Sequence, residues 1–237
     1  MAIKIKDLGI IINNNVIVLS DFHIGLEEAL NKQGFLIPRN QFTDIINRLK
    51  RIINNKKFKI IVINGDLKHE FGEISKQEWE QTSLLLDFLS NHCDKIVLVK
   101  GNHDTIIGPI VKRKKIEVVE EFLLGKVMIC HGHKIIENKD FRIADTIIIG
   151  HEHPSVSISN GIRSERFKCF LIGRFRGKKL IVMPSFNPIM EGTDVTKEKL
   201  LSPYIKNIDD FSIIVVSEKG ETFDFGKVKN IKDVRDY

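Results

Sequence analysis

The sequence feature that most constrains the fold is a short apolar stretch that runs directly into polar residues. Residues Ile60 to His69 read IIVINGDLKH, so a buried strand is expected to end on Gly65 and Asp66. A glycine at a strand end lets the backbone turn sharply and approach a bound group closely. Asp66 would then stand at the carboxyl end of a central strand, where open α/β sheets build their sites. We therefore expect Asp66 to lie at the centre of a site.

Four further apolar stretches end in the same way. Val16–Ser20 leads into Asp21-Phe22-His23, Lys95–Lys100 into Gly101-Asn102-His103-Asp104, Lys126–Cys130 into His131-Gly132-His133, and Thr146–Gly150 into His151-Glu152-His153. Strands of a layered α/β domain that carry polar clusters at their carboxyl ends bring those clusters to one rim. The sequence thus predicts a single site assembled from five strand ends.

The side chains at these strand ends are those that bind metals. Seven of the eight histidines lie in or just after the clusters: His23, His69, His103, His131, His133, His151 and His153. A lone histidine is more often structural, but seven together with Asp21, Asp66 and Asn102 are hard to explain by packing. Imidazoles and carboxylates suit Zn, Mn or Fe. Because two ions about 3.5–4 Å apart need a bridging carboxylate, we predict a binuclear centre bridged by Asp66.

Helices are expected between the strands. Apolar residues from Gln41 to Asn54 recur at helical spacing, and Ser75 with Glu78 forms a capping-box spacing that opens a second helix. After Pro154 the pattern changes to alternation. Residues 155–179 are predicted to form basic antiparallel hairpins near the site, turning at Asn160-Gly161, and three later stretches read as closing strands. Since no linker or repeat interrupts the chain, residues 1–237 are predicted to form one domain.

Composition sets limits on partners and location. No apolar run approaches the roughly 20 residues that cross a bilayer, and the first residues do not resemble a signal peptide, so we expect a cytoplasmic protein without membrane contact. Cys93, Cys130 and Cys169 are widely spaced and are interpreted as reduced thiols. The formal net charge of +6 favours a polyanionic partner such as nucleic acid, although a Lys-rich composition can also reflect life at high temperature.

The clusters together resemble the calcineurin-like metallophosphoesterase superfamily. The motifs DxH, GDxxH, GNHD, HGH and GHxH occur in this order between Asp21 and His153. The resemblance implies an α/β fold of layered metallophosphoesterase type, with two central mixed β-sheets flanked by helices in an αββα sandwich. It also implies a metal-dependent phosphoesterase, with two divalent metal ions as cofactors. Mn2+ is the expected metal, and Fe, Zn or Ni are alternatives.

The resemblance assigns a role to each motif position. One ion would be held by Asp21, His23 and His153 together with Asp66, and the other by Asn102, His131 and His151, again with Asp66. His103 would meet the substrate phosphate, with Asp104 steering it, and His69 would orient His103 or touch phosphate. An ordinary turn carboxylate is the alternative for Asp104, and a surface histidine is the alternative for His69. His133 is not needed as a ligand.

Finer features narrow the expected substrate. His69 ends the GDxxH motif as it does in SbcD-type nuclease subunits, and Pro184-Ser185-Phe186-Asn187-Pro188 resembles archaeal SbcD-related phosphoesterases and the PdeM-like, ligase-associated DNA-damage endonucleases. The implied function is a DNA nuclease acting on single strands or ends in repair. Basic residues at 112–115 and 163–179 would support DNA binding, or are solvated faces. The alternatives are a phosphodiesterase acting on a small nucleotide ester and a non-enzymatic interaction module. A helicase or ligase partner is conceivable, and the oligomeric state is open, with a homodimer among the options.

Overall fold

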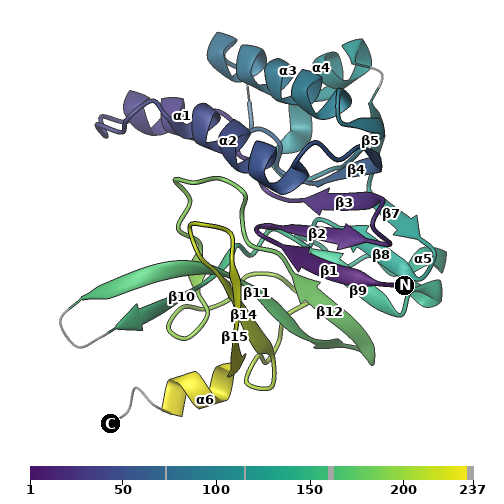
Figure 1. Ribbon diagram of the computed structural model, residues 1–237, viewed down its shortest axis with the longest axis vertical. Coiled ribbons are helices and arrows are strands. Elements are labelled where there is room, and N and C mark those ends of the chain that lie inside the picture. Colours follow the sequence, from purple (N-terminus) through teal and green to yellow (C-terminus); the bar gives the residue numbers. More distant parts are fainter. Residues whose placement is uncertain (73, 115, 160–162, 234–237) are drawn as a thin grey trace.

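The computed structural model describes residues 1–72, 74–114, 116–159 and 163–233. Within these residues the chain forms two mixed β-sheets that pack face to face, with helices on the outside (Figure 1). We call them the N-terminal sheet, which contains β1 to β6, and the C-terminal sheet, which contains β7 to β15. This arrangement confirms the predicted layered α/β metallophosphoesterase fold. The assignment of residues 1–237 to a single domain stays a prediction.

The N-terminal sheet has the strand order β1-β2-β3-β4-β5-β6. Its strands are β1 (Ile3–Lys6), β2 (Gly9–Ile12), β3 (Val16–Leu19), β4 (Phe58–Asn64), β5 (Cys93–Val99) and β6 (Glu117–Val119). Strands β3 to β6 run parallel, whereas β1 to β3 form an antiparallel meander. Every residue of β3 is buried, as expected for a parallel strand covered on both faces.

The C-terminal sheet has the main order β13-β10-β11-β12-β9-β8-β7, and β14 pairs with β11 and β15. Its strands are β7 (Glu121–Leu124), β8 (Val127–Cys130), β9 (Thr146–Ile149), β10 (Pro154–Ser159), β11 (Ser164–Phe175), β12 (Lys178–Val182), β13 (Thr193–Asp194), β14 (Ser212–Val216) and β15 (Thr222–Lys227). Strands β10 and β11 pair antiparallel, which confirms the predicted hairpin. Its predicted turn at Asn160-Gly161 lies outside the described residues.

The helices are short, and most of them cover the N-terminal sheet. They are α1 (Leu26–Lys32), α2 (Gln41–Ile53), α3 (Lys76–Ser90), the 3-10 turn η1 (Asp104–Ile106), α4 (Gly108–Arg113), α5 (Lys139–Ile143) and α6 (Val228–Asp233). Figure 1 shows α1 to α4 together on the outer face of the N-terminal sheet. The Ser75 side chain accepts a hydrogen bond from the Glu78 N–H at 3.0 Å, as the capping spacing predicts. No helix in the described part of the chain is long and apolar enough to cross a membrane.

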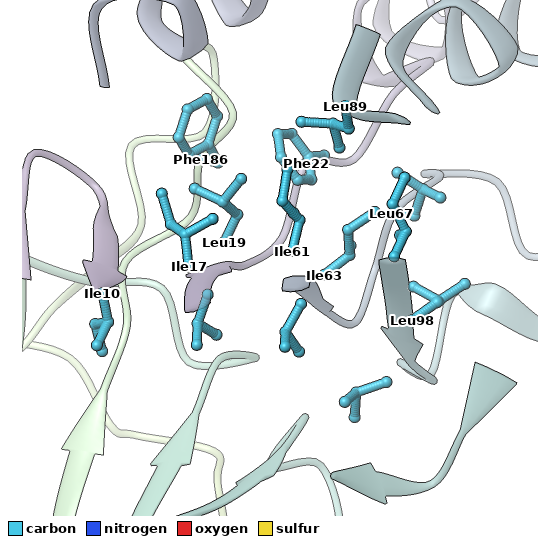
Figure 2. Packing of buried hydrophobic residues seen from close by; sticks show 14 of the residues in the cluster. Ile10, Ile17, Leu19, Phe22, Ile61, Ile63, Leu67, Leu89, Leu98 and Phe186 are labelled. Atoms are coloured by element: carbon cyan, nitrogen blue, oxygen red, sulfur yellow. The ribbon is translucent and has the colours of Figure 1, made fainter. Parts of the chain in front are cut away.

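The core between the layers holds the strand ends in place. Leu89 of α3 and Leu19, Ile61 and Leu98 of the N-terminal sheet belong to one buried cluster (Figure 2), which continues into Ile148 of the C-terminal sheet. Neighbouring residues of β8 and β9 alternate between this cluster and a second one on the far face of the C-terminal sheet. The two sheets therefore share one apolar interface, and this interface fixes their rims relative to each other.

Candidate metal centre

The predicted site residues come together where the strands of both sheets end. Asp21 follows β3, Asp66 follows β4 and Asn102 follows β5, and these three strands are adjacent and parallel. His131 follows β8 and His151 follows β9, which are adjacent and parallel in the other sheet. Because the sheets stack, the five strand ends meet at one rim, as the sequence predicts.

A first group of ligand atoms joins the two sheets. Asp21, His23 and His153 offer atoms that all lie within 4.8 Å of one another. The Oδ1 of Asp21 lies 3.1 Å from Nε2 of His153, and the Nε2 atoms of His23 and His153 lie 3.4 Å apart. Asp21 and His23 are buried. Two imidazole nitrogens and a carboxylate oxygen thus converge on one point.

A second group lies beside the first. Asp66, His131 and His151 also offer atoms within 4.8 Å of one another. The Oδ1 of Asn102 lies 3.0 Å from Nε2 of His131. These four residues are the set that the family resemblance assigns to a second ion, with Asp66 as the shared member.

Asp66 lies between the two groups. One of its oxygens, Oδ2, is 3.6 Å from Nε2 of His23 in the first group and 3.2 Å from Nε2 of His131 in the second. The exposed fraction of its side chain is only 2%. A single carboxylate oxygen within reach of both groups has the position that a metal-bridging ligand needs.

The electrostatics of the centre suit divalent cations. Burial, followed by the neighbouring His153, lowers the pKa of His23 to about 3, and burial lowers that of His151 to about 4, so both rings are neutral and offer lone pairs. Burial also opposes the charge on His131, but Asp66 outweighs it and raises the pKa of His131 to about 9. The Nδ1 of His23 is buried without a hydrogen-bond partner among the described residues. The neutral imidazoles of His23 and His151 beside two buried carboxylates are donors that suit Mn, Fe or Zn.

The backbone at the centre is held in an unusual conformation. Five of the predicted ligands have positive φ angles: Asp21 (58°), His23 (43°), Asp66 (48°), His151 (64°) and His153 (50°). Each such residue costs on the order of 1–3 kcal/mol and persists only where its surroundings fix it, which happens mainly at functional sites. Five ligands that share this cost indicate that the fold is built around their convergence.

A buried hydrogen-bond network fixes these backbone positions. The Ser20 hydroxyl donates to Oδ2 of Asp21 at 2.5 Å, and the Ser185 hydroxyl donates to the Asp21 carbonyl at 2.8 Å. The Asn187 side chain donates to the carbonyls of Phe22 and His23 at 2.8 and 3.1 Å. Sequence reasoning singled out the stretch around Ser185 and Asn187 only through resemblance and missed this role. Polar residues between two prolines just after an apolar strand were the available signal.

Comparison with known proteins agrees with this geometry. A family model described as calcineurin-like phosphoesterase matches residues 15–170, which includes every predicted metal ligand. The chain belongs to the calcineurin-like phosphoesterase family. It is accordingly a metal-dependent phosphoesterase, and its aspartate and histidine clusters are suited to divalent metal ions.

Three solved structures are similar to the chain at low sequence identity, and the first of them shares its fold. The nuclease MPE of Pseudomonas putida is 18% identical, with 93% of each chain covered and a TM-score of 0.66. Zinc-bound Vps29 of Entamoeba histolytica is 16% identical, covering 89% of this chain and 99% of that one, with a TM-score of 0.39. An uncharacterised protein of Streptococcus pneumoniae, described as a predicted phosphoesterase, is 16% identical, covering 90% of this chain and 97% of that one, with a TM-score of 0.37. The search of curated proteins gives no match.

His103 and His69 lie at the edge of this phosphoesterase centre. The Nε2 of His103 is 3.9 Å from Oδ2 of Asp66, and its Nδ1 is hydrogen-bonded to the His69 carbonyl. The His69 and His103 rings stack with centroids 5.4 Å apart, and both rings, with His23, form a third group of candidate ligand atoms. The structure therefore brings both predicted catalytic histidines to the centre, and their chemical roles stay predictions.

Asp104 is placed differently from the other predicted catalytic residues. It is fully buried, and its two oxygens accept hydrogen bonds from the N–H groups of Leu67 and Gly101, each at 3.0 Å. Burial, and then the charge of Asp66, raises the pKa of Asp104 to about 6. These contacts tie the loop after β4 to the loop after β5. Its predicted steering of His103 stays a prediction.

The remaining singled-out residues lie around or outside the centre. The centroid of the His133 ring lies 5.3 Å from that of His131, and His133 belongs to none of the ligand groups found among the described residues. His92 bonds to the Phe88 carbonyl at the end of α3. In the basic 155–179 segment, Arg166 pairs with Glu198 and Arg176 with Glu137, so part of its charge is neutralised within the protein. The segment begins directly after His153, which places its first residues beside the centre.

Proposed function

We propose that this phosphoesterase is a binuclear, Mn-dependent phosphodiesterase that cleaves DNA, at single strands or ends, in repair. The observation that carries the two-ion proposal is the position of Asp66, whose Oδ2 is within 3.6 Å of one ligand group and 3.2 Å of the other. One ion would be held by Asp21, His23, His153 and Asp66. The other would be held by Asn102, His131, His151 and Asp66. When bound, such a pair supplies an activated water nucleophile at neutral pH and polarises the phosphoryl oxygens.

The residues of the chain orient the reaction. His103 is fixed at Nδ1 by the His69 carbonyl, so its Nε2 faces the centre and is the atom that meets the phosphate. There it stabilises the developing negative charge and protonates the leaving oxygen. The exposed fractions of the His103 and His153 side chains are 16% and 14%, so both rings can be reached from solvent.

DNA as the substrate rests on three supports. The formal net charge is +6, exposed cations occur on the hairpin that starts beside His153, and the fold is shared with a nuclease. A small nucleotide phosphodiester remains the second candidate, because the ligand set itself does not distinguish the two.

The test is a metal-dependence assay with matched substrates. The protein is stripped of metal and assayed with Mn, Mg or Zn on labelled single-stranded and duplex DNA, beside bis-p-nitrophenyl phosphate and p-nitrophenyl phosphate. We expect Mn-dependent DNA cleavage that falls by about 10²–10⁴-fold in His103→Ala and is lost in Asp66→Asn. His92→Ala, a histidine outside the centre, is the matched control and should keep full activity.

The outcomes separate the proposals. Cleavage of the small diester without cleavage of any DNA would replace DNA by a small phosphodiester. Metal analysis that finds one ion per chain, or two ions in Asp66→Asn with full activity, would refute the bridging role. Full DNA cleavage by the metal-stripped protein would overturn the proposal as a whole.

A further inference from the structure

The outer edge of the centre carries an exposed aromatic side chain with no structural task of its own. Phe71 lies two residues after His69, and 55% of its surface is exposed. Single exposed apolar residues are common on protein surfaces and by themselves need no explanation. Phe71 differs from the others because its ring lies against the predicted catalytic histidine, with centroids 3.8 Å apart and an interplanar angle of 33°.

The rings of His23, His103 and Phe71 contact one another in sequence, and their exposure to solvent increases in that order. His23 is buried, the His103 side chain is 16% exposed and Phe71 is 55% exposed, and successive centroids lie 4.8 and 3.8 Å apart. One side of Phe71 is occupied by His103, and more than half of its surface is left free. A flat group that enters the centre from solvent would meet this ring immediately before it meets His103.

The position of Phe71 is fixed by the chain, as a binding platform requires. The Thr105 hydroxyl donates to the Phe71 carbonyl at 2.6 Å, which ties the loop after β4 to the turn after His103. The next residue, Ile106, is 46% exposed and extends the apolar character of the same turn. Exposed apolar side chains thus lie beside a centre suited to metal ions. A substrate that fits both has an anionic group, which would bind at the centre, and a flat apolar group next to it, which would contact the exposed side chains.

We propose that Phe71 is a specificity-determining residue that stacks on a nucleobase adjoining the scissile phosphodiester. This inference rests on the proposed function and narrows its substrate class to nucleotide esters with a base beside the reacting phosphate. Aromatic side chains stack on any base, so the contact selects for the presence of a base and not for its identity. His103 holds the phosphate end, and Phe71 holds the base end.

The test compares two substrates that differ only in their bases. The Mn-loaded enzyme is assayed on a labelled oligothymidylate and on a chain of the same length built from abasic deoxyribose phosphates. Phe71→Ala should lower kcat/KM for the oligothymidylate by about 5- to 150-fold more than it lowers kcat/KM for the abasic chain. Phe71→Trp should keep wild-type preference. Phe223→Ala is the matched control, because Phe223 is 48% exposed and lies on β15, which pairs with β14 in the C-terminal sheet.

A binding measurement separates this inference from the proposed function. Fluorescence of 2-aminopurine deoxynucleoside 5′-monophosphate should be quenched by stacking on the Mn-loaded wild type, Phe71→Trp and Phe223→Ala, and not by Phe71→Ala. Phe71-dependent quenching without DNA cleavage would refute the nuclease proposal and leave the stacking inference standing. Equal quenching by Phe71→Ala, or none by the wild type, overturns the inference. An equal loss of rate on the abasic chain also overturns it, because Phe71 would then only position His103.

Discussion

The two sheets contribute different chemistry to the same centre. The strand ends of the N-terminal sheet supply all of the predicted oxygen ligands, Asp21, Asp66 and Asn102, whereas the predicted ligands of the C-terminal sheet are all imidazoles. Neither of the two groups predicted to bind an ion comes from one sheet alone, since Asp21 lies with His153 and Asp66 with His131. The convergence of the predicted ligands therefore depends on how the sheets dock.

The docking is reciprocal at the level of single atoms. A Cβ on Gly65, at the end of β4, would lie 2.1 Å from Nδ1 of His131, and a Cβ on Gly150, at the end of β9, would lie 2.1 Å from the Ser20 hydroxyl. In each sheet, a glycine therefore lies where a polar side chain of the other sheet packs closely against the backbone, and a larger residue would not fit. The two N–H···O contacts from His151 to the Asp21 carboxylate, at 3.3 and 3.2 Å, complete the join.

The largest expected effect comes from separating the sheets at Gly150. In Gly150→Ala the new methyl would meet the Ser20 hydroxyl at 2.1 Å and Oδ2 of Asp21 at 2.4 Å. No positive φ complicates the substitution at this position. Because a misplacement of about 1 Å can cost 10²-fold in rate, we expect kcat/KM to fall by about 100-fold or more. Steady-state kinetics on bis-p-nitrophenyl phosphate measure this.

A surface glycine provides the control for Gly150. Gly108→Ala introduces the same methyl at the start of α4, where nothing lies within 4 Å of the new Cβ, and it should keep wild-type rate. Wild-type kinetics in Gly150→Ala would show that the sheets can shift apart without cost. The reciprocal fit would then not hold the centre together.

A smaller effect is expected from the network that supports the N-terminal strand ends. Asn187→Ala removes one donor to the carbonyls of Phe22 and His23 and so weakens the hydrogen-bond network that supports the first ligand group. Loss of a residue that orients ligands typically lowers metal affinity by about 10–100-fold, and titration of the metal-stripped protein with Mn measures it. Asn207→Ala changes an exposed asparagine whose side-chain oxygen accepts a hydrogen bond from the Asp209 N–H, and this variant should bind Mn as the wild type does. Equal affinity in both variants would contradict the bracing role.

This brace also shows where sequence reasoning stops. The convergence of the predicted ligands could be foreseen because each signal is local: an apolar strand, a turn and a polar cluster within ten residues. The capping of α3 by Ser75 was visible for the same reason. The role of Asn187 was not, because it acts on residues 164 positions away in the chain. The length of β11, which pairs with β10 in its first half and with β12 and β14 in its second, likewise depends on partners that no local pattern names.

Substitution of Glu78 tests the connection between α3 and the loop after β4, which carries His69. Its buried Oε1 accepts hydrogen bonds from the N–H groups of His69 and Glu70, at 2.9 and 3.1 Å. Glu78→Ala leaves both donors without this acceptor, which should lower the free energy of unfolding by about 1–3 kcal/mol and loosen the loop that holds His103. Glu78→Gln keeps one oxygen and should lie close to wild type. Urea unfolding measures both, and equal destabilisation in the two variants would rule out the acceptor role.

The smallest effect is expected at the thiols, one in the N-terminal sheet and two in the C-terminal sheet. Cys93, Cys130 and Cys169 are free and buried, and burial raises the pKa of Cys130 from 9.0 to about 12 although it directly precedes His131. The folded chain therefore keeps this proton at pH values where the unfolded chain loses it, so the free energy of unfolding is unaffected below pH 9 and falls as the pH rises towards 12.

At pH 8 a disulfide-exchange reagent should modify no thiol in the native protein and all three thiols in denaturant. Incubation of the native protein with the reagent should therefore leave its activity unchanged. Rapid native reaction at Cys130 alone would show that the C-terminal rim opens locally beside a metal ligand, and the rigid docking inferred from Gly65 and Gly150 would then be wrong.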